Sequence, residues 1–140
     1  MIQQDYLIRL IRRFFDALAR MTKKREQGKF AEAQFEANQA YGVLGITPDF
    51  ANTMSSETIA SLLSEPEKIR LMAKLAIEEA KLLERKGDPL TSTRKYIQAA
   101  ELIYEARAIK QNEEDALMLQ ELFRNFPTSS LGKKYREPNS

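Results

Sequence analysis

Apolar residues recur at helical spacing along almost the whole chain, and glycine or proline interrupts this spacing at only a few places. Gly28 is expected to end a first helix over residues 5–26, and Gly45 a second over residues 30–44. Because so short a connection joins them, the two helices are expected to pack as an antiparallel hairpin, 5–44. The first helix has a broad apolar face, made of Tyr6, Leu7, Leu10, Ile11, Phe14, Phe15, Leu18 and Met21. No segment shows the sustained alternation of a strand, so the sequence predicts an all-α fold.

A second hairpin is predicted over residues 66–110, with Gly87 at its turn. Pro66 suits a first helical turn, and Ser64 stands before it at the spacing of a capping box. The short-helix connector 46–65, which is rich in caps and small apolar groups, is expected to hold two short helical pieces.

The last part of the chain is expected to divide in two. A capping helix is predicted over residues 113–126, because stacked hairpins need a terminal element to cover their last apolar face. The remaining residues, 127–140, are polar and predict a flexible tail. Residues 1–126 are therefore expected to form a single helical domain of about five to six helices.

An internal repeat relates the two hairpins. Steps of two, five and twelve residues from Gly28 lead to Phe30, Ala33 and Ala40, and the same steps from Gly87 lead to Pro89, Ser92 and Ala99. These steps resemble the second half of a tetratricopeptide repeat, although Ala37 stands where that family usually has an aromatic residue. The resemblance implies tetratricopeptide-like helical hairpins, stacked as a right-handed α-α superhelix.

The chain also resembles a family of small bacterial all-helical proteins that open with a stretch like MIQQDYLIRLI. The likeness continues through a hairpin like GKFAEA and a second one like LLERKGDPLTSTRKYIQAAELIYEA, and it covers about residues 1–110. Those relatives have no established activity, so the resemblance implies a fold and not a function.

Composition excludes several kinds of chemistry. The chain has no cysteine and no histidine, which removes disulfides, zinc-thiolate sites, imidazole acid–base catalysis and Ser-His-Asp or Cys-His nucleophiles. No catalytic residue, cofactor or metal ligand is therefore assigned. The net charge of +2 is too small to indicate nucleic-acid binding by itself. With no signal peptide and no apolar run long enough for a membrane span, a cytoplasmic protein is expected.

The stretch RLIRRFFDAL raises a problem of helix geometry. Phe14 and Phe15 are adjacent, so they point about 100° apart on a helix and cannot share one narrow core-facing stripe. If Phe14 lies in the core, then Ile8, Ile11 and Phe15 emerge on a flank with Arg12 at its rim. Exposed apolar groups of this kind usually mark a partner surface.

Three interpretations of this flank stay open. It could form the two-fold seam of a homodimer, the commonest way in which soluble proteins cover such a face. Residues 50–63 of the same chain could fold back over it. It could also bind an anionic surface, a membrane or a nucleic acid, through its basic residues, which are Arg9, Arg12, Arg13, Arg20, Lys23, Lys24 and Arg25.

A second candidate surface is a peptide-binding groove on the inner face of the stacked hairpins. Its candidate residues are Phe30, Asn38, Lys95, Tyr96 and Tyr104. The sequence as a whole favours a non-enzymatic protein–protein interaction or scaffold protein, a homodimer through its first helix. The alternative function is a peripheral binder of anionic surfaces.

Overall fold

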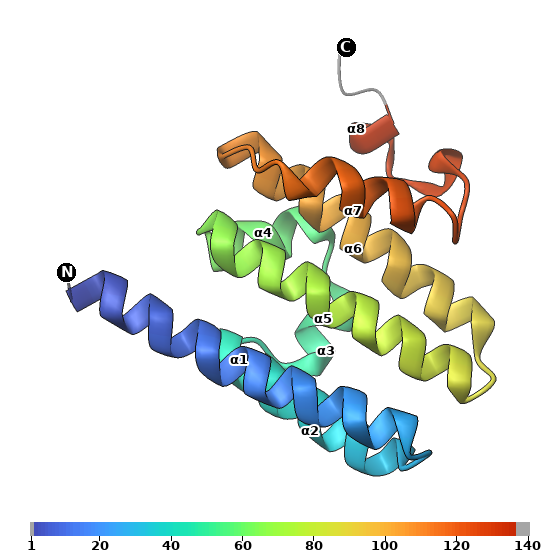
Figure 1. Cartoon of the computed structure of the whole chain (residues 1–140). Helices are drawn as coiled ribbons and strands as arrows, with labels where there is room; N and C mark the ends of the chain where they lie inside the picture. Colours follow the sequence, from blue (N-terminus) through green and yellow to red (C-terminus); the bar gives the residue numbers. More distant parts are fainter. Residues whose placement is uncertain (1, 137–140) are drawn as a thin grey trace.

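The computed structural model describes residues 2–136, and this part of the chain is all-helical, with eight α-helices, one short 3-10 helix and no strand. Two long antiparallel pairs dominate it (Figure 1): α1 (Ile2–Glu26) with α2 (Phe30–Leu44), and α5 (Pro66–Arg85) with α6 (Pro89–Ile109). Helix α5 packs on α6 and also on both helices of the first pair. The predicted all-α fold class is confirmed.

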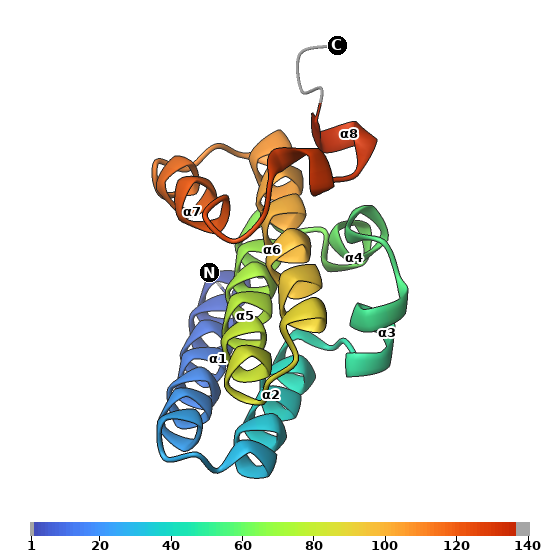
Figure 2. The same cartoon turned by 90° about the vertical axis from the view of Figure 1, so that its right-hand side faces the viewer.

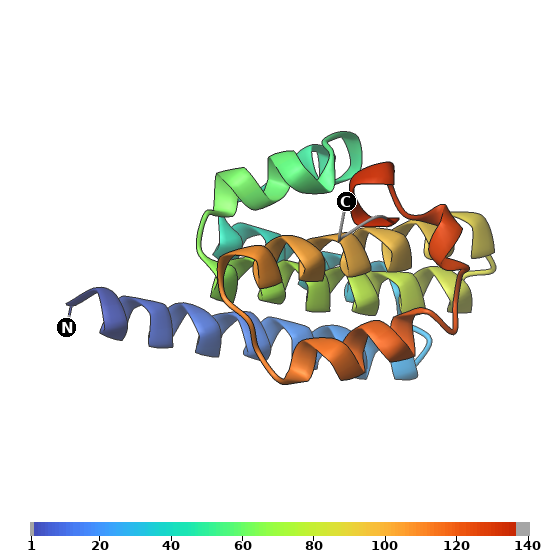
Figure 3. The same cartoon turned by 90° about the horizontal axis from the view of Figure 1, so that it is seen from above.

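The shorter helices lie on different sides of the α5–α6 pair. Helices α3 (Pro48–Thr53) and α4 (Ser56–Leu63) lie on the side away from α1, where α4 packs on α6 and α5 (Figures 2 and 3). Helix α7 (Glu114–Leu122) packs on α6. The first turns of α1 project beyond the rest of the molecule (Figure 3). Within residues 2–136, no helix is both long enough and apolar enough to cross a bilayer.

Glycine makes both hairpin turns. Gly28 and Gly87 have φ values of 74° and 83°, in the left-handed region that other residues rarely adopt. In each turn the residue after the glycine donates a backbone hydrogen bond to the carbonyl five residues earlier, Lys29 to Lys24 and Asp88 to Leu83. This closure satisfies carbonyls at the end of α1 and α5 and reverses the chain. The repeated glycine therefore marks equivalent turns.

Side-chain caps begin several helices as their sequences indicate. The side chains of Thr47, Ser55 and Asp88 accept backbone hydrogen bonds at the start of α3, α4 and α6. The capping box expected at Ser64 is wrong. This residue ends α4 with a φ of 63°, and Glu65 stands at the N-cap of α5 without a side-chain cap. The loop between α4 and α5 is too short for Ser64 to serve both helices.

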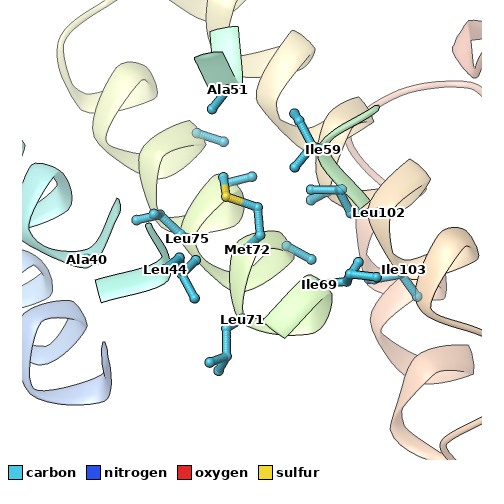
Figure 4. Close-up of a cluster of buried hydrophobic side chains, with 14 of the residues drawn as sticks. Ala40, Leu44, Ala51, Ile59, Ile69, Leu71, Met72, Leu75, Leu102 and Ile103 are labelled. Carbon is cyan, nitrogen blue, oxygen red and sulfur yellow. The ribbon is translucent and has the colours of Figure 1, made fainter. Parts of the chain in front are cut away.

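The core combines alanines with a larger number of big apolar side chains. Figure 4 shows Met72 of α5 between Leu44 of α2 and Ile59 of α4, so one side chain bridges both hairpins and the connector. Helices α2, α5 and α6 also bury small residues, which let neighbouring backbones approach closely: Ala33, Ala37, Ala40, Ala73, Ala76, Ala80, Ala99, Ala100 and Ala106. Ser92 of α6 donates a hydrogen bond of 2.8 Å to the carbonyl of Ala80.

Residues 128–136 correct the prediction of a flexible tail over 127–140. They form a 3-10 turn (Thr128–Ser130) and a short helix α8 (Lys133–Arg136) that return to α6. Leu131 is buried, and the ring of Tyr135 stacks on Tyr104 of α6 with 6.2 Å between centroids. The part of the predicted tail over 137–140 lies outside the described residues.

Two carboxylates of α6 hold this returning segment. Glu101 accepts hydrogen bonds from the backbone N–H of Gly132 and from the Ser56 hydroxyl of α4, both at 2.8 Å. One oxygen of Glu105 accepts from Lys134 at 2.8 Å and from the Tyr135 hydroxyl at 2.6 Å. The polar composition of this segment suggests a flexible tail, but its charged Lys134 pairs with Glu105 of α6.

The burial pattern predicts a sharp contrast between two phenylalanines. Phe14 is fully buried, whereas Phe35 on α2 is 59% exposed. We expect Phe14→Ala to lower the free energy of unfolding by about 3–5 kcal/mol through lost burial and a cavity. The matched change Phe35→Ala should cost less than about 1 kcal/mol. Urea unfolding followed by circular dichroism measures both, and equal losses would contradict the assigned core.

Candidate functional site

The flank of α1 presents apolar side chains to solvent. Ile8 is 49% exposed and Phe15 is 42% exposed, whereas the neighbouring Phe14 is fully buried. Ile11 is half-buried against the core, and Arg12 is exposed. The rings of Phe14 and Phe15 meet edge to face with 5.6 Å between centroids. The structure thus brings all four residues proposed for the partner surface onto one side of one helix.

Residues 50–63 do not cover this flank. Ile59 and Leu63 are buried, but α4 packs on α6 and α5, and α3–α4 lie across that pair from α1 (Figures 2 and 3). The intrachain-cover interpretation is therefore wrong. The physical reason is that α5 and α6 offer the connector a deeper apolar surface than a single helix flank does.

The basic residues of α1 divide into paired and unpaired groups. Arg20 contacts Glu36 at 2.9 Å, Lys24 contacts Glu32 at 3.1 Å, and Arg25 contacts Glu78 at 2.6 Å. These three cations fasten α1 to α2 and α5. The others are exposed and have no ion pair within residues 2–136: Arg9, Arg12, Arg13 and Lys23.

The five residues proposed for a groove are not brought together. Asn38 is exposed on α2 and accepts a hydrogen bond from Gln34, while Tyr104 lies under the returning segment. Lys95 and Tyr96 are buried, and the Tyr96 hydroxyl donates to Glu84. Phe30 is half-buried, with the Arg85 guanidinium 6.0 Å from its ring centre. Most of these side chains therefore serve packing between helices.

A buried polar cluster joins α2, α5 and α6. The Tyr41 hydroxyl donates a hydrogen bond to Glu79, and the Lys95 ammonium lies 3.3 Å from both the carboxylate and the hydroxyl. Gln34 donates to the other carboxylate oxygen at 3.5 Å. Tyr41, Glu79 and Lys95 are each at most 7% exposed. Burial, the negative charge of Glu79 and the hydrogen bond to it raise the pKa of Tyr41 far above its ordinary value.

Of this cluster, only Lys95 is among the candidate binding residues predicted from the sequence. Glu79 carried a signal, because it falls among the apolar residues Leu75, Met72 and Leu82 on the buried side of α5. A carboxylate at such a position needs a cation or several donors, since burying an unpaired charge is costly. Tyr41 carried no such signal.

Lys95 also lines a hollow of about 310 Å³ between α3 and α6. Gln98 of α6 lines the same hollow and donates a hydrogen bond of 2.7 Å to the carbonyl of Ala51. Its carbonyl oxygen is buried and has no hydrogen-bond partner within the described residues. Across the whole described part of the chain, no group of three or more acidic side chains is placed to hold a metal ion.

Comparison with protein-family models, with curated proteins and with solved structures gives no match. The geometry of the residues is therefore the basis for the functional argument below.

The Tyr41–Glu79–Lys95 cluster predicts strong coupling between its two charges. Lys95→Met should lower the free energy of unfolding by about 3–5 kcal/mol, because it leaves a buried carboxylate without its cation. Adding Glu79→Gln should recover most of this loss, since the Tyr41 hydroxyl can still donate to the amide oxygen. A double-mutant cycle by urea unfolding measures the coupling. Additive losses would show that the two charges do not depend on each other.

The Arg25–Glu78 pair predicts a pH dependence of stability. Burial alone would raise the pKa of Glu78, but hydrogen bonds from Arg25 and Thr22 and the charges of Lys81 and Arg25 outweigh it, so this pKa is lowered. The pair therefore stabilises the fold above the carboxyl pKa of the unfolded chain, and this contribution disappears as pH falls through the lower folded value.

We accordingly expect Glu78→Gln to cost about 1–3 kcal/mol at pH 7 and progressively less as the pH falls below about 4. Urea unfolding at several pH values measures this difference. Glu32→Gln is the control, because its partner Lys24 lies at the surface and such pairs contribute little. A cost for Glu78→Gln that is constant with pH would contradict the assignment.

Proposed function

We propose that this protein is a non-enzymatic scaffold that acts by protein–protein interaction, and that it forms a homodimer through the flank of α1. The observation that carries the proposal is the exposure of Phe15 and Ile8 on the outer side of the first helix. An aromatic ring beside an isoleucine on a helix is costly to leave in water, and a partner surface removes that cost.

The arrangement of α1 favours this role. The helix is fixed to the body by buried Phe14 and Met21 and by the ion pair of Arg25 with Glu78, so its outer side is held in place. A rigid surface loses little conformational entropy when it binds. The N-terminal end of α1 extends beyond the other helices (Figure 1).

The absence of catalysis is part of the same proposal. The buried acid–base groups of the polar cluster, Tyr41, Glu79 and Lys95, satisfy one another. Their arrangement suits a structural link between three helices better than a reaction with a substrate. The lack of histidine and cysteine supports this view.

A right-handed, tetratricopeptide-like stack remains the proposed architecture within the all-α class. The packing of α5 on both α1 and α2, and of α7 on α6, is the order of contacts expected when successive hairpins stack. Helices α3 and α4 would then be an insertion that lengthens the interval between the two turn glycines. We also propose that the chain is related to the bacterial family with the MIQQDYLIRLI-like opening.

The alternative function is binding of an anionic surface. Arg9, Arg12 and Arg13 are exposed and favour it, but Asp5 and Asp16 lie exposed on the same helix. Binding to vesicles of anionic phospholipid or to DNA that weakens steeply as salt rises would support this function in place of the homodimer.

The homodimer predicts a defined effect of one charge. Size-exclusion chromatography with light scattering at tens of micromolar protein should give the mass of two chains, and Phe15→Glu should give the mass of one. A buried carboxylate at the seam cannot be neutralised by its symmetry mate, which carries the same charge. Phe35→Glu on α2 is the matched control and should leave the dimer intact. A monomeric wild type, unchanged by Phe15→Glu, would refute the proposal.

A further inference from the structure

A strip of alternating charge runs along α1 beside its apolar flank. Asp5, Arg12, Asp16 and Lys23 fall within about 40° of one another around the helix axis, at 100° per residue. All four are exposed, and none of them forms an ion pair with another residue of the described range. Along these four residues the sign of the charge alternates from negative Asp5 to positive Lys23, and exposed Arg9 lies at the edge of the strip, about 60° around the helix from Arg12.

The charges of the strip are complementary to those of a second, antiparallel copy of the same strip. Position 14 lies midway between Asp5 and Lys23, and also midway between Arg12 and Asp16. We infer that the α1 helices of two copies pair antiparallel and centred on position 14, with Arg12 opposite Asp16 of the second copy and Asp5 opposite Lys23. In such a two-fold pair each side of a helix meets its own copy, so the two strips lie together.

The same register also pairs the apolar side chains. Phe15 is one residue from the centre, so the two Phe15 residues lie about 3 Å apart along the helix axis, at 1.5 Å per residue. Ile8 comes beside the exposed Ala19 of the second copy, where a small side chain leaves room for it. Ile11 comes beside Leu18 of the second copy, and both are partly buried within their own chain.

A second copy fits this surface better than an anionic partner does. The strip carries two positive and two negative charges, so a phosphate-rich surface would face Asp5 and Asp16 as like charges. A second α1 in reverse order places each of these carboxylates opposite a cation. This register rests on the proposed homodimer and specifies how its two helices meet.

Disulfide cross-linking tests the register directly, because the natural chain contains no cysteine. The double variant Ile8→Cys/Ala19→Cys retains Phe15 and places each thiol next to its counterpart in the second copy. After mild oxidation we expect most of the protein to run as a cross-linked dimer on a non-reducing gel. Either single variant should cross-link at least tenfold less. In the inferred register two copies of residue 8 lie about 18 Å apart along the axis, and two copies of residue 19 about 15 Å apart.

Charge reversal provides a second test that leaves the apolar seam unchanged. Arg12→Asp should weaken the dimer by roughly tenfold, measured as its dissociation constant by sedimentation. The swapped variant Arg12→Asp/Asp16→Arg should restore the affinity, because the opposite charges meet again. The matched control Arg13→Asp changes an exposed cation that lies about 100° around the helix from Arg12, and it should have little effect.

The outcomes separate the register from the homodimer. Strong cross-linking of Ile8→Cys to itself would indicate a parallel pair or an antiparallel pair centred near residue 8, and would overturn the register while leaving the homodimer intact. A dimer that does not cross-link in the double variant and does not respond to Arg12→Asp would also overturn the register alone. A wild-type chain that is monomeric by light scattering would overturn both.

Discussion

The close contact of α5 with its neighbours on three sides is the constraint on which the rest of the structure depends. Ala76 and Ala80 face α6 and are fully buried, and Ser92 bonds to the carbonyl of Ala80, so the two backbones lie near each other. On its other sides α5 buries Leu75 and Leu82, which leaves little of the helix to solvent. A larger side chain at either alanine would separate α5 from α6 and disturb every helix that packs on the pair.

Helix α5 buries polar side chains as well as apolar ones. These polar groups determine how the neighbouring helices are oriented. Glu79 faces Tyr41 of α2 and Lys95 of α6, while Glu78 faces Arg25 of α1. Apolar packing alone would tolerate a range of helix orientations, since dispersion and burial have little directional preference. Hydrogen-bonded charges tolerate far fewer, because an unmatched buried charge is strongly destabilising. The two glutamates thus bind α1, α2 and α6 to α5 in one arrangement.

Much of the fold could be predicted because its signals are local. Gly28 and Gly87 identify both turns from the backbone conformation that they alone adopt readily, and helical periodicity identifies the long helices. The contacts of residues 128–136 with α6 could not be predicted, because they depend on carboxylates such as Glu105 that are distant in sequence. The candidate groove could not be predicted correctly for the same reason. Residue type and spacing suggested Lys95 as a ligand-binding group, but its environment depends on how α2 and α5 pack against α6.

The first helix shows how one local pattern can satisfy the core and still leave a surface to be covered. Helix geometry allows Phe14 into the core only by turning its neighbour Phe15 outward, and α5 and α2 already occupy the positions on either side of the buried stripe. Phe15 meets the Phe14 ring edge to face, yet 42% of its surface stays exposed, where a polar side chain would avoid the cost of leaving a ring in water. Ile11 packs partly against the core, but the packing of one chain does not account for the exposed surfaces of Ile8 and Phe15. The alternating charges beside them make a random accumulation of apolar groups a poorer account than a seam between two helices.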